Sequence, residues 1–228
     1  MTIFKFAVIR GLRNPATLIC TCVLPIALVL IRPIWEREFF SGFSLIAFLI
    51  MLGSFMLARN MLADKTDGAI VRILAAPVTM LNYLMQNLLA CMIPLTLQMI
   101  LVCSLGAVLY DWEFSFVIAL ILCYIIFSFA SVAMSFAWNC LFKDKENSYA
   151  GFSAVITFVA LLSGLWLPLE LLPQPLQYVG AVFPAYWVVR SMDALQEYGA
   201  ASGYWVGLGA MLMFTAVYLL YGGKRRII

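Results

Sequence analysis

Residues able to do covalent or acid–base chemistry are few in this chain of 228 residues, and they do not gather into a catalytic set. The sequence has no histidine, which excludes His-based acid–base catalysis, H-E-x-x-H zinc chemistry and Ser-His-Asp triads. Its carboxylates are scattered, and it has no G-x-x-x-x-G-K-[ST] phosphate-binding loop. We therefore expect a chain that is not an enzyme.

The six cysteines do not suggest a disulfide framework or a metal site. All of them fall inside or at the ends of apolar runs, and Cys20 and Cys22 have no histidine or further cysteine nearby to complete a set of metal ligands. Small polarizable residues at such positions are typical of helix packing. We expect this role for Cys20, Cys22, Cys91, Cys103, Cys123 and Cys140.

The composition indicates an integral membrane protein. Hydrophobic residues make up 65% of the chain and charged residues 11%, with a mean hydropathy of +1.02, whereas soluble domains are about 45–50% apolar and about 25% charged. Each bilayer crossing needs about 20 helical residues, so little length is left for a soluble domain. We expect one transmembrane domain over residues 1–228, and a net charge of +3 too small to suggest nucleic-acid binding.

Apolar runs predict an all-α polytopic protein with six transmembrane helices. Asn14-Pro15 marks the bend into the first span, and Pro25 predicts a kink within it. The fourth span is longer than the bilayer needs, which predicts that it tilts or projects. The six predicted spans cover about residues 16–31, 43–62, 84–109, 114–142, 149–165 and 204–221.

Residues 1–14 predict an amphipathic helix that lies in the membrane interface. Apolar residues alternate there with Lys5, Arg10 and Arg13, which suits a helix with its cations toward lipid headgroups. A signal peptide is the alternative. The following apolar segment lacks a convincing small-residue cleavage site and runs on to the charged cluster at 32–38, which argues against that alternative.

Residues 167–198 are too broken by proline to span the membrane and too apolar for a free loop. Pro168, Pro173, Pro175 and Pro184 interrupt this stretch, and a re-entrant or interfacial helical hairpin on the outer side fits it best. Glu170 lies within it. Ionisable groups at a membrane edge are usually functional, so Glu170 is a candidate gate or substrate contact; a solvated or helix-capping carboxylate is the alternative.

The distribution of cations predicts that both termini are cytoplasmic, in a multi-pass protein of the inner (plasma) membrane. With this orientation eleven cations lie inside and three outside, a strong positive-inside bias. Trp35, Trp112, Trp166, Trp187 and Trp205 then fall near the outer interface, where aromatic rings settle. The inside set is Lys5, Arg10, Arg13, Arg59, Lys65, Arg72, Lys143, Lys145, Lys224, Arg225 and Arg226; the outside set is Arg32, Arg37 and Arg190.

This topology places residues 64–83 in a cytoplasmic loop between the second and third spans. Its middle predicts a helix with an apolar stripe, and Asp64 and Asp67 near its amino end would favour the helix dipole. The stripe could face lipid, in a helix that only lies flat, or a protein groove. Its members are Ala69, Ile70, Ile73, Leu74 and Val78.

Two motifs resemble those of the ABC-2 type membrane (permease) subunits of bacterial ABC exporters. The first is the loop pattern of Asp67, Gly68, Arg72, Leu74 and Pro77. The second lies in residues 163–195, where Pro168, Glu170, Leu172 and Pro173 match a P-L-E-x-L-P core and Pro184 precedes an aromatic region. Asp67 stands where a glutamate is usual, and Phe183 where an asparagine often precedes the proline.

The resemblance implies a division of labour. The loop would carry a coupling helix that docks on a separate ABC ATPase subunit, and residues 167–198 would form a re-entrant hairpin near an outer gate. Two membrane subunits, as a homodimer or heterodimer, and two ATPases would make the transporter. The partner would bind ATP and Mg, with no cofactor in this chain.

The apolar spans and small outer loops favour an amphipathic or hydrophobic cargo, such as a drug, an antibiotic peptide or a lipid-like molecule, and hence a role such as multidrug or antibiotic resistance. A secondary transporter or channel would be expected to carry ionisable residues within its spans, and essentially none are found there. The alternative left open is a membrane immunity or anchor protein that sequesters a toxin without ATP.

Overall fold

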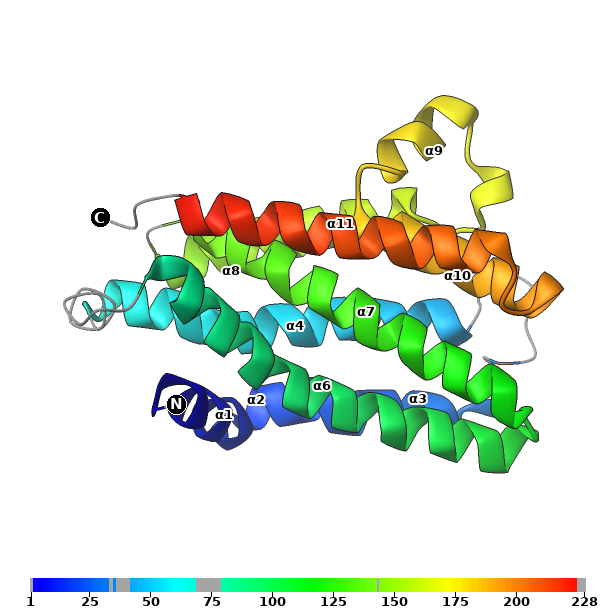
Figure 1. Ribbon diagram of the computed structural model, residues 1–228, viewed down its shortest axis with the longest axis horizontal. Coiled ribbons are helices and arrows are strands. Elements are labelled where there is room, and N and C mark those ends of the chain that lie inside the picture. Colours follow the sequence, from blue (N-terminus) through cyan, green and yellow to red (C-terminus); the bar gives the residue numbers. More distant parts are fainter. Residues whose placement is uncertain (1, 33–34, 36–41, 69–78, 143, 225–228) are drawn as a thin grey trace.

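Long helices that lie side by side form the bundle at the centre of the fold (Figure 1). The computed structural model describes residues 2–32, 35, 42–68, 79–142 and 144–224. Within them, four helices are long and apolar enough to cross a membrane. The central one, α7, packs against the other three. They are α4 (Gly42–Thr66), α6 (Met80–Tyr110), α7 (Phe114–Asn139) and α11 (Ser202–Lys224).

The first predicted span is a jointed helix that turns sharply at its start. It consists of α2 (Pro15–Leu18), the π-helical segment η1 (Ile19–Val23) and α3 (Leu24–Leu30), and α1 (Thr2–Arg13) precedes it. The axes of residues 3–11 and 15–30 differ by 74°. The Asn14 side chain accepts the N–H of Ala16 at 3.1 Å, and Pro15 occupies the first turn, which suits a residue without an N–H. The predicted bend at Asn14-Pro15 is confirmed.

Six spans were predicted, and this number is not reached in the described residues. Four helices qualify, or five if α1 and the jointed helix count as one broken span. The predicted fifth span, α8 (Lys145–Leu162), does not qualify because its first turn is charged and polar. Asp144 caps that turn by accepting the N–H of Asn147 at 2.7 Å, so the helix starts four residues before the predicted 149.

The loop predicted over residues 64–83 is shorter than expected, because the helices on both sides extend into it. Helix α4 continues to Thr66, and α6 begins at Met80, where the Thr79 hydroxyl accepts the N–H of Asn82 at 3.3 Å as an N-cap. The fourth span is shorter than predicted, since α7 ends at Asn139 rather than near 142.

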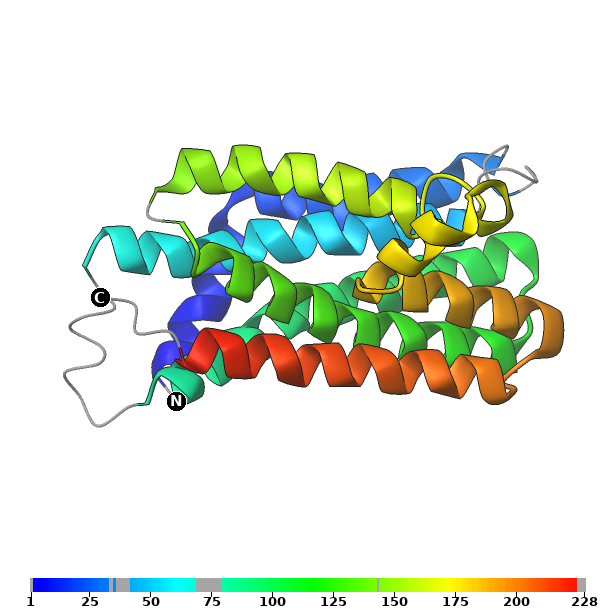
Figure 2. The same cartoon turned by 90° about the horizontal axis from the view of Figure 1, so that it is seen from above.

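The proline-rich segment divides into two parts. After a 3-10 turn (Leu169–Leu171), α9 (Gln174–Gly180) stands out from the side of the bundle, while α10 (Pro184–Tyr198) lies along α11 (Figures 1 and 2). Pro175 and Pro184 sit in first turns, where proline is tolerated. The Gln177 amide donates to the carbonyls of Leu169 and Leu172, both at 2.8 Å, which closes the turn. The predicted hairpin therefore has one helix off the bundle and one packed within it.

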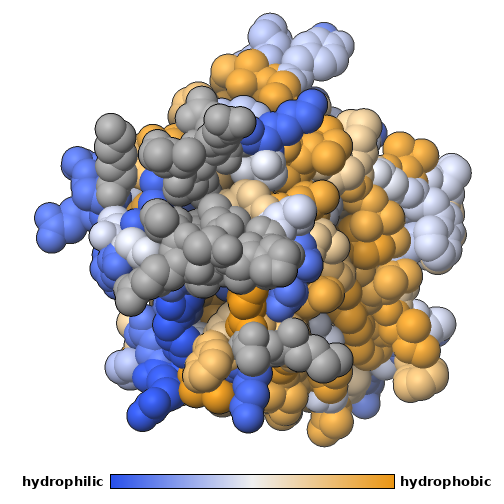
Figure 3. Space-filling model, turned by 60° about the vertical axis from the view of Figure 1, so that its left-hand side comes forward, coloured by the Kyte–Doolittle hydropathy of each residue, from blue (hydrophilic) through white to orange (hydrophobic). Residues whose placement is uncertain are grey.

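Helix α1 and the end of α11 lie at the same end of the bundle, which we call the basal end; the other is the distal end (Figure 1). At the distal end Trp35 packs against Phe43, Tyr110 and Trp112, with ring centroids 5.1–5.4 Å apart. Figure 3 shows hydrophilic side chains gathered at the basal end and apolar side chains along the bundle. None of the six cysteines, all of which are described, forms a disulfide.

Candidate functional site

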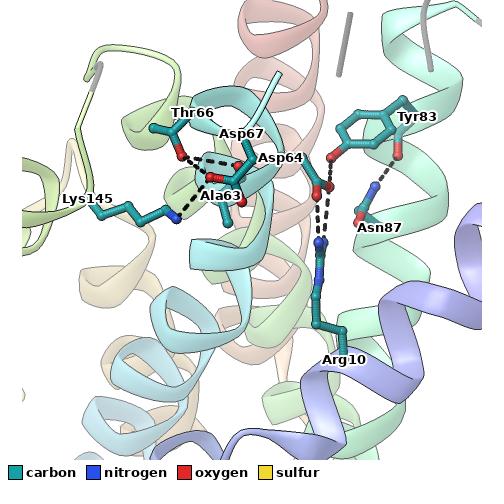
Figure 4. A network of polar contacts seen from close by, with 8 residues as sticks. All are labelled: Arg10, Ala63, Asp64, Thr66, Asp67, Tyr83, Asn87 and Lys145. Carbon is teal, nitrogen blue, oxygen red and sulfur yellow. Dashed lines mark hydrogen bonds and ion pairs between the residues drawn. The ribbon is translucent and has the colours of Figure 1, made fainter. Parts of the chain in front are cut away.

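A buried carboxylate joins three helices at the basal end (Figure 4). Two guanidinium nitrogens of Arg10, on α1, donate to the two oxygens of Asp64, on α4, at 2.5 and 3.0 Å. The hydroxyl of Tyr83, on α6, donates to the same carboxylate at 2.6 Å. The Asp64 side chain is 12% exposed and that of Arg10 is 40% exposed. Such a bidentate, charge-assisted arrangement fixes geometry as well as adding energy.

Asp64 does not stand near the amino end of a loop helix, as the sequence suggested. It lies in the last turns of α4, where an acidic side chain is unfavourable for the helix dipole. Arg10 and Tyr83 compensate by supplying three donors to its carboxylate. Neither residue was predicted as part of this site. An aspartate at the end of a long apolar run, with an arginine-bearing amphipathic helix elsewhere in the chain, was the available signal.

A second set of contacts ties the end of α4 to the segment between α7 and α8. The ammonium of Lys65 donates to the carbonyl oxygens of Phe142 at 2.9 Å and of Cys140 at 3.5 Å. Lys145, in the first turn of α8, lies 3.5 Å from the carboxylate of Asp67. This last pair is largely exposed and therefore weak. Helices α1, α4, α6 and α8 are thus linked beside the two ends of the loop.

The predicted coupling residues are only partly described. Asp67 forms the ion pair with Lys145. Gly68 has a φ of +67°, a backbone conformation that favours glycine, and none of the described residues comes within 4 Å of a Cβ at this position. Arg72, Leu74 and Pro77, with the apolar stripe around them, lie outside the described residues.

The predicted outer residues lie in the turn before α9 and at the starts of α9 and α10. Pro168 precedes the 3-10 turn, Pro173 precedes α9 and Pro184 begins α10. Glu170 is exposed and lines a hollow of about 730 Å³ with Arg190, Asp193 and Glu197 of α10. The structure therefore brings Glu170 beside charged residues that sequence reasoning had not connected with it.

The pKa of Asp193 offers a direct check on this hollow. Partial burial and, after it, the Glu170 carboxylate raise the pKa of Asp193 to about 6, while Arg190 lowers it. We expect Glu170→Gln to lower this pKa, so that Asp193 loses its proton at a lower pH, and Arg190→Gln to raise it. Titration of ¹³C-labelled aspartate carboxyls by NMR measures both shifts. Equal or like-signed shifts in the two variants would contradict the arrangement.

A comparison with known protein families gives a match for this chain. Residues 37–223 match the family model described as ABC-2 family transporter protein. No individual curated protein matches the chain. The matched range includes Asp64, Tyr83 and the distal hollow but not Arg10.

Proposed function

Since the chain belongs to the ABC-2 transporter family, as a multi-pass membrane permease component, we propose that it is the transmembrane subunit of an ATP-driven exporter. ABC-2 permeases generally pair with ATPase subunits, and this sequence carries no phosphate-binding loop of its own. In the proposed assembly two such ATPases bind ATP and Mg, and a second membrane subunit, identical or related, completes the path.

The observation that carries the proposal is the carboxylate network at the basal end. Asp64 and Tyr83 stand next to the two ends of the loop and are joined through Arg10 to α1. A force applied to the loop would therefore reach three helices together, because the contacts are short, buried on the Asp64 side and bidentate. This is what a coupling element requires.

Charge supports a cytoplasmic basal end. Most cations of the described residues belong to segments at that end, such as Lys5, Arg13 and Lys224, whereas the distal hollow holds three carboxylates and one arginine. This agrees with the positive-inside tendency. Both ends of the described chain lie there (Figure 1), so a cytoplasmic ATPase would meet the loop directly.

The proposed mechanism is mechanical. ATP-driven closure of the two ATPases moves the docked helix, about residues 67–77. The network passes this movement to α4 and, through α1, to the jointed first span, and the contact of Asp67 with Lys145 passes it to α8. A path then opens between the two membrane subunits, with Glu170 and Pro168, Pro173 and Pro184 near its outer gate. The cargo is an amphipathic or hydrophobic molecule, consistent with the apolar exposed faces of the spans.

Docking of the ATPase is tested by placing a charge in the loop. We expect Leu74→Glu to lower co-purification of the ATPase about tenfold, equivalent to about 1.4 kcal/mol, because a carboxylate in an apolar groove would be desolvated. The measurement is a quantitative pull-down from membranes that contain the ATPase, together with stimulation of its hydrolysis.

Asn82→Glu is the matched control. Asn82 is exposed in the first turn of α6, where an acidic side chain suits the helix dipole, so association should stay at the parental level. Unchanged association and export in Leu74→Glu would refute docking through the loop. An ATPase whose hydrolysis the chain never stimulates would favour the alternative of a non-transporting anchor or immunity protein.

A further inference from the structure

A hollow of about 570 Å³ lies between α1 and the basal ends of α4 and α6. This volume is within the range of about 300–1,000 Å³ that small-molecule sites occupy. Part of its lining is apolar and comes from α1 through Ile3, Phe6 and Ile9. Another part is polar and consists of Arg10, also on α1, with Asp64 and Tyr83. The hollow therefore offers both kinds of surface that an amphipathic ligand needs.

The charges around the hollow favour an anion. Asp64 is already matched by Arg10 and by the hydroxyl of Tyr83. Arg13 also lines the hollow and is exposed. Among the described residues it has no hydrogen-bond or ion-pair partner. In addition, Nε of Arg10 is buried without an acceptor in the same described part of the chain. Within the described part of the chain, the site thus carries one uncompensated positive charge and one donor without an acceptor.

The position of the hollow matches the level of lipid headgroups. Helix α1 lies across the basal end, at 74° to the jointed helix that enters the bundle, as an interfacial helix does. Phe6 and Ile9 are 69% and 41% exposed, so the apolar part of the lining opens toward the surroundings of the bundle rather than into its core. Hydrophilic residues gather at the same end (Figure 3).

We propose that this hollow binds an anionic phospholipid of the membrane, with Arg13 on the phosphate and one acyl chain along Phe6 and Ile9. Arginine presents a planar fork of donors that fits phosphate. An inorganic anion would leave the apolar part of the lining unused, and a cationic amphiphile would meet Arg13. Because Asp64 and Tyr83 line the same hollow, a bound lipid would contact both α1 and the network at the ends of the loop.

The proposal is tested by counting lipids retained on the purified full-length protein. After delipidation and addition of phosphatidylglycerol or phosphatidylcholine, native mass spectrometry should show one phosphatidylglycerol held at least about tenfold more tightly than phosphatidylcholine. Arg13→Gln should remove this preference, with an unchanged elution volume and circular dichroism spectrum that confirm folding.

Lys5→Gln is the matched control, because Lys5 is an exposed cation on the same helix that does not line the hollow. Its retention of phosphatidylglycerol should equal that of the parent. Equal losses in both variants would indicate diffuse attraction to the helix and overturn the proposal, as would equal retention of the two lipids by the parent. Dodecyl phosphate should displace the lipid, and displacement by inorganic phosphate at the same concentration would overturn a lipid site. None of these readouts depends on an ATPase or on transport.

Discussion

Replacing Asp64 with alanine is expected to lower the free energy of unfolding by about 2–3 kcal/mol and to release α1 from the bundle. The carboxylate accepts three hydrogen bonds, from two nitrogens of Arg10 and from the hydroxyl of Tyr83. Tyr83 is 0% exposed, so its hydroxyl would be left buried and unpaired, at about 1–3 kcal/mol. The guanidinium of Arg10 can be hydrated in the variant because 40% of its side chain is exposed. The loss of its ion pair therefore contributes less to the fall in the free energy of unfolding.

The measurement is reversible unfolding in detergent–lipid micelles, combined with hydrogen–deuterium exchange of the α1 amides to detect the release of this helix. Tyr83→Phe should cost only about 1 kcal/mol, since Arg10 and Asp64 remain paired. Asp67→Ala is the matched control: its carboxylate is 66% exposed and pairs with the exposed Lys145, so the expected change is within about 0.5 kcal/mol. Equal effects of Asp64→Ala and Asp67→Ala would show that the network does not hold α1.

Replacing Gly207 with alanine is expected to destabilise the packing of α10 on α11 by about 1–3 kcal/mol. A Cβ at position 207 would meet Oγ of Ser191 and would lie 2.9 Å from the backbone oxygen of Trp187, both on α10. Close backbone approach through small residues is a common basis of helix packing in membranes. The clash with a backbone atom cannot be relieved by turning a side chain, so it outweighs the better helix propensity of alanine, about 1 kcal/mol.

Gly209 provides the control on the same helix. The space around its missing Cβ is open within 4 Å, so Gly209→Ala should leave stability unchanged or raise it by up to about 1 kcal/mol. Unfolding midpoints of the two variants, with proteolysis in the turn between α10 and α11 as a local readout, make the comparison. A loss of stability in both, or in neither, would contradict the proposed contact.

The membrane class, the long helices and the bend into the first span were predictable because each depends on local sequence. A long run of apolar residues must cross the membrane or be buried, whatever other segments surround it. At the bend, the Asn14 side chain caps the helix that begins at Pro15. The approximate positions of α4, α6, α7 and α11 follow for the same reason. Helix ends were less certain, since Thr79 and Asp144 act as caps only in their final geometry.

The contacts that make the candidate site could not be read from the sequence. Arg10 and Asp64 are 54 positions apart, and their meeting depends on how α1 turns back at the basal end. Residues 167–198 were predicted as a helical hairpin because of their prolines, but the packing of α10 within the bundle was not predicted. Val188 and Met192 of α10 are buried. A single sequence does not show whether such a helix is buried or exposed, because this depends on the helices that pack against it.

The π-helical segment Ile19–Val23 changes which side chains of the first span lie on the same face. A π turn holds one more residue than an α turn over the same part of a helix, and each residue of an α-helix advances the side chains by about 100°. The faces of α2 and α3 are therefore out of step by one residue. Thr21, within the segment, is buried, and its methyl group would lie 3.1 Å from a Cβ on Gly53. A single helical wheel drawn over residues 15–30 would assign one half of this helix to the wrong face.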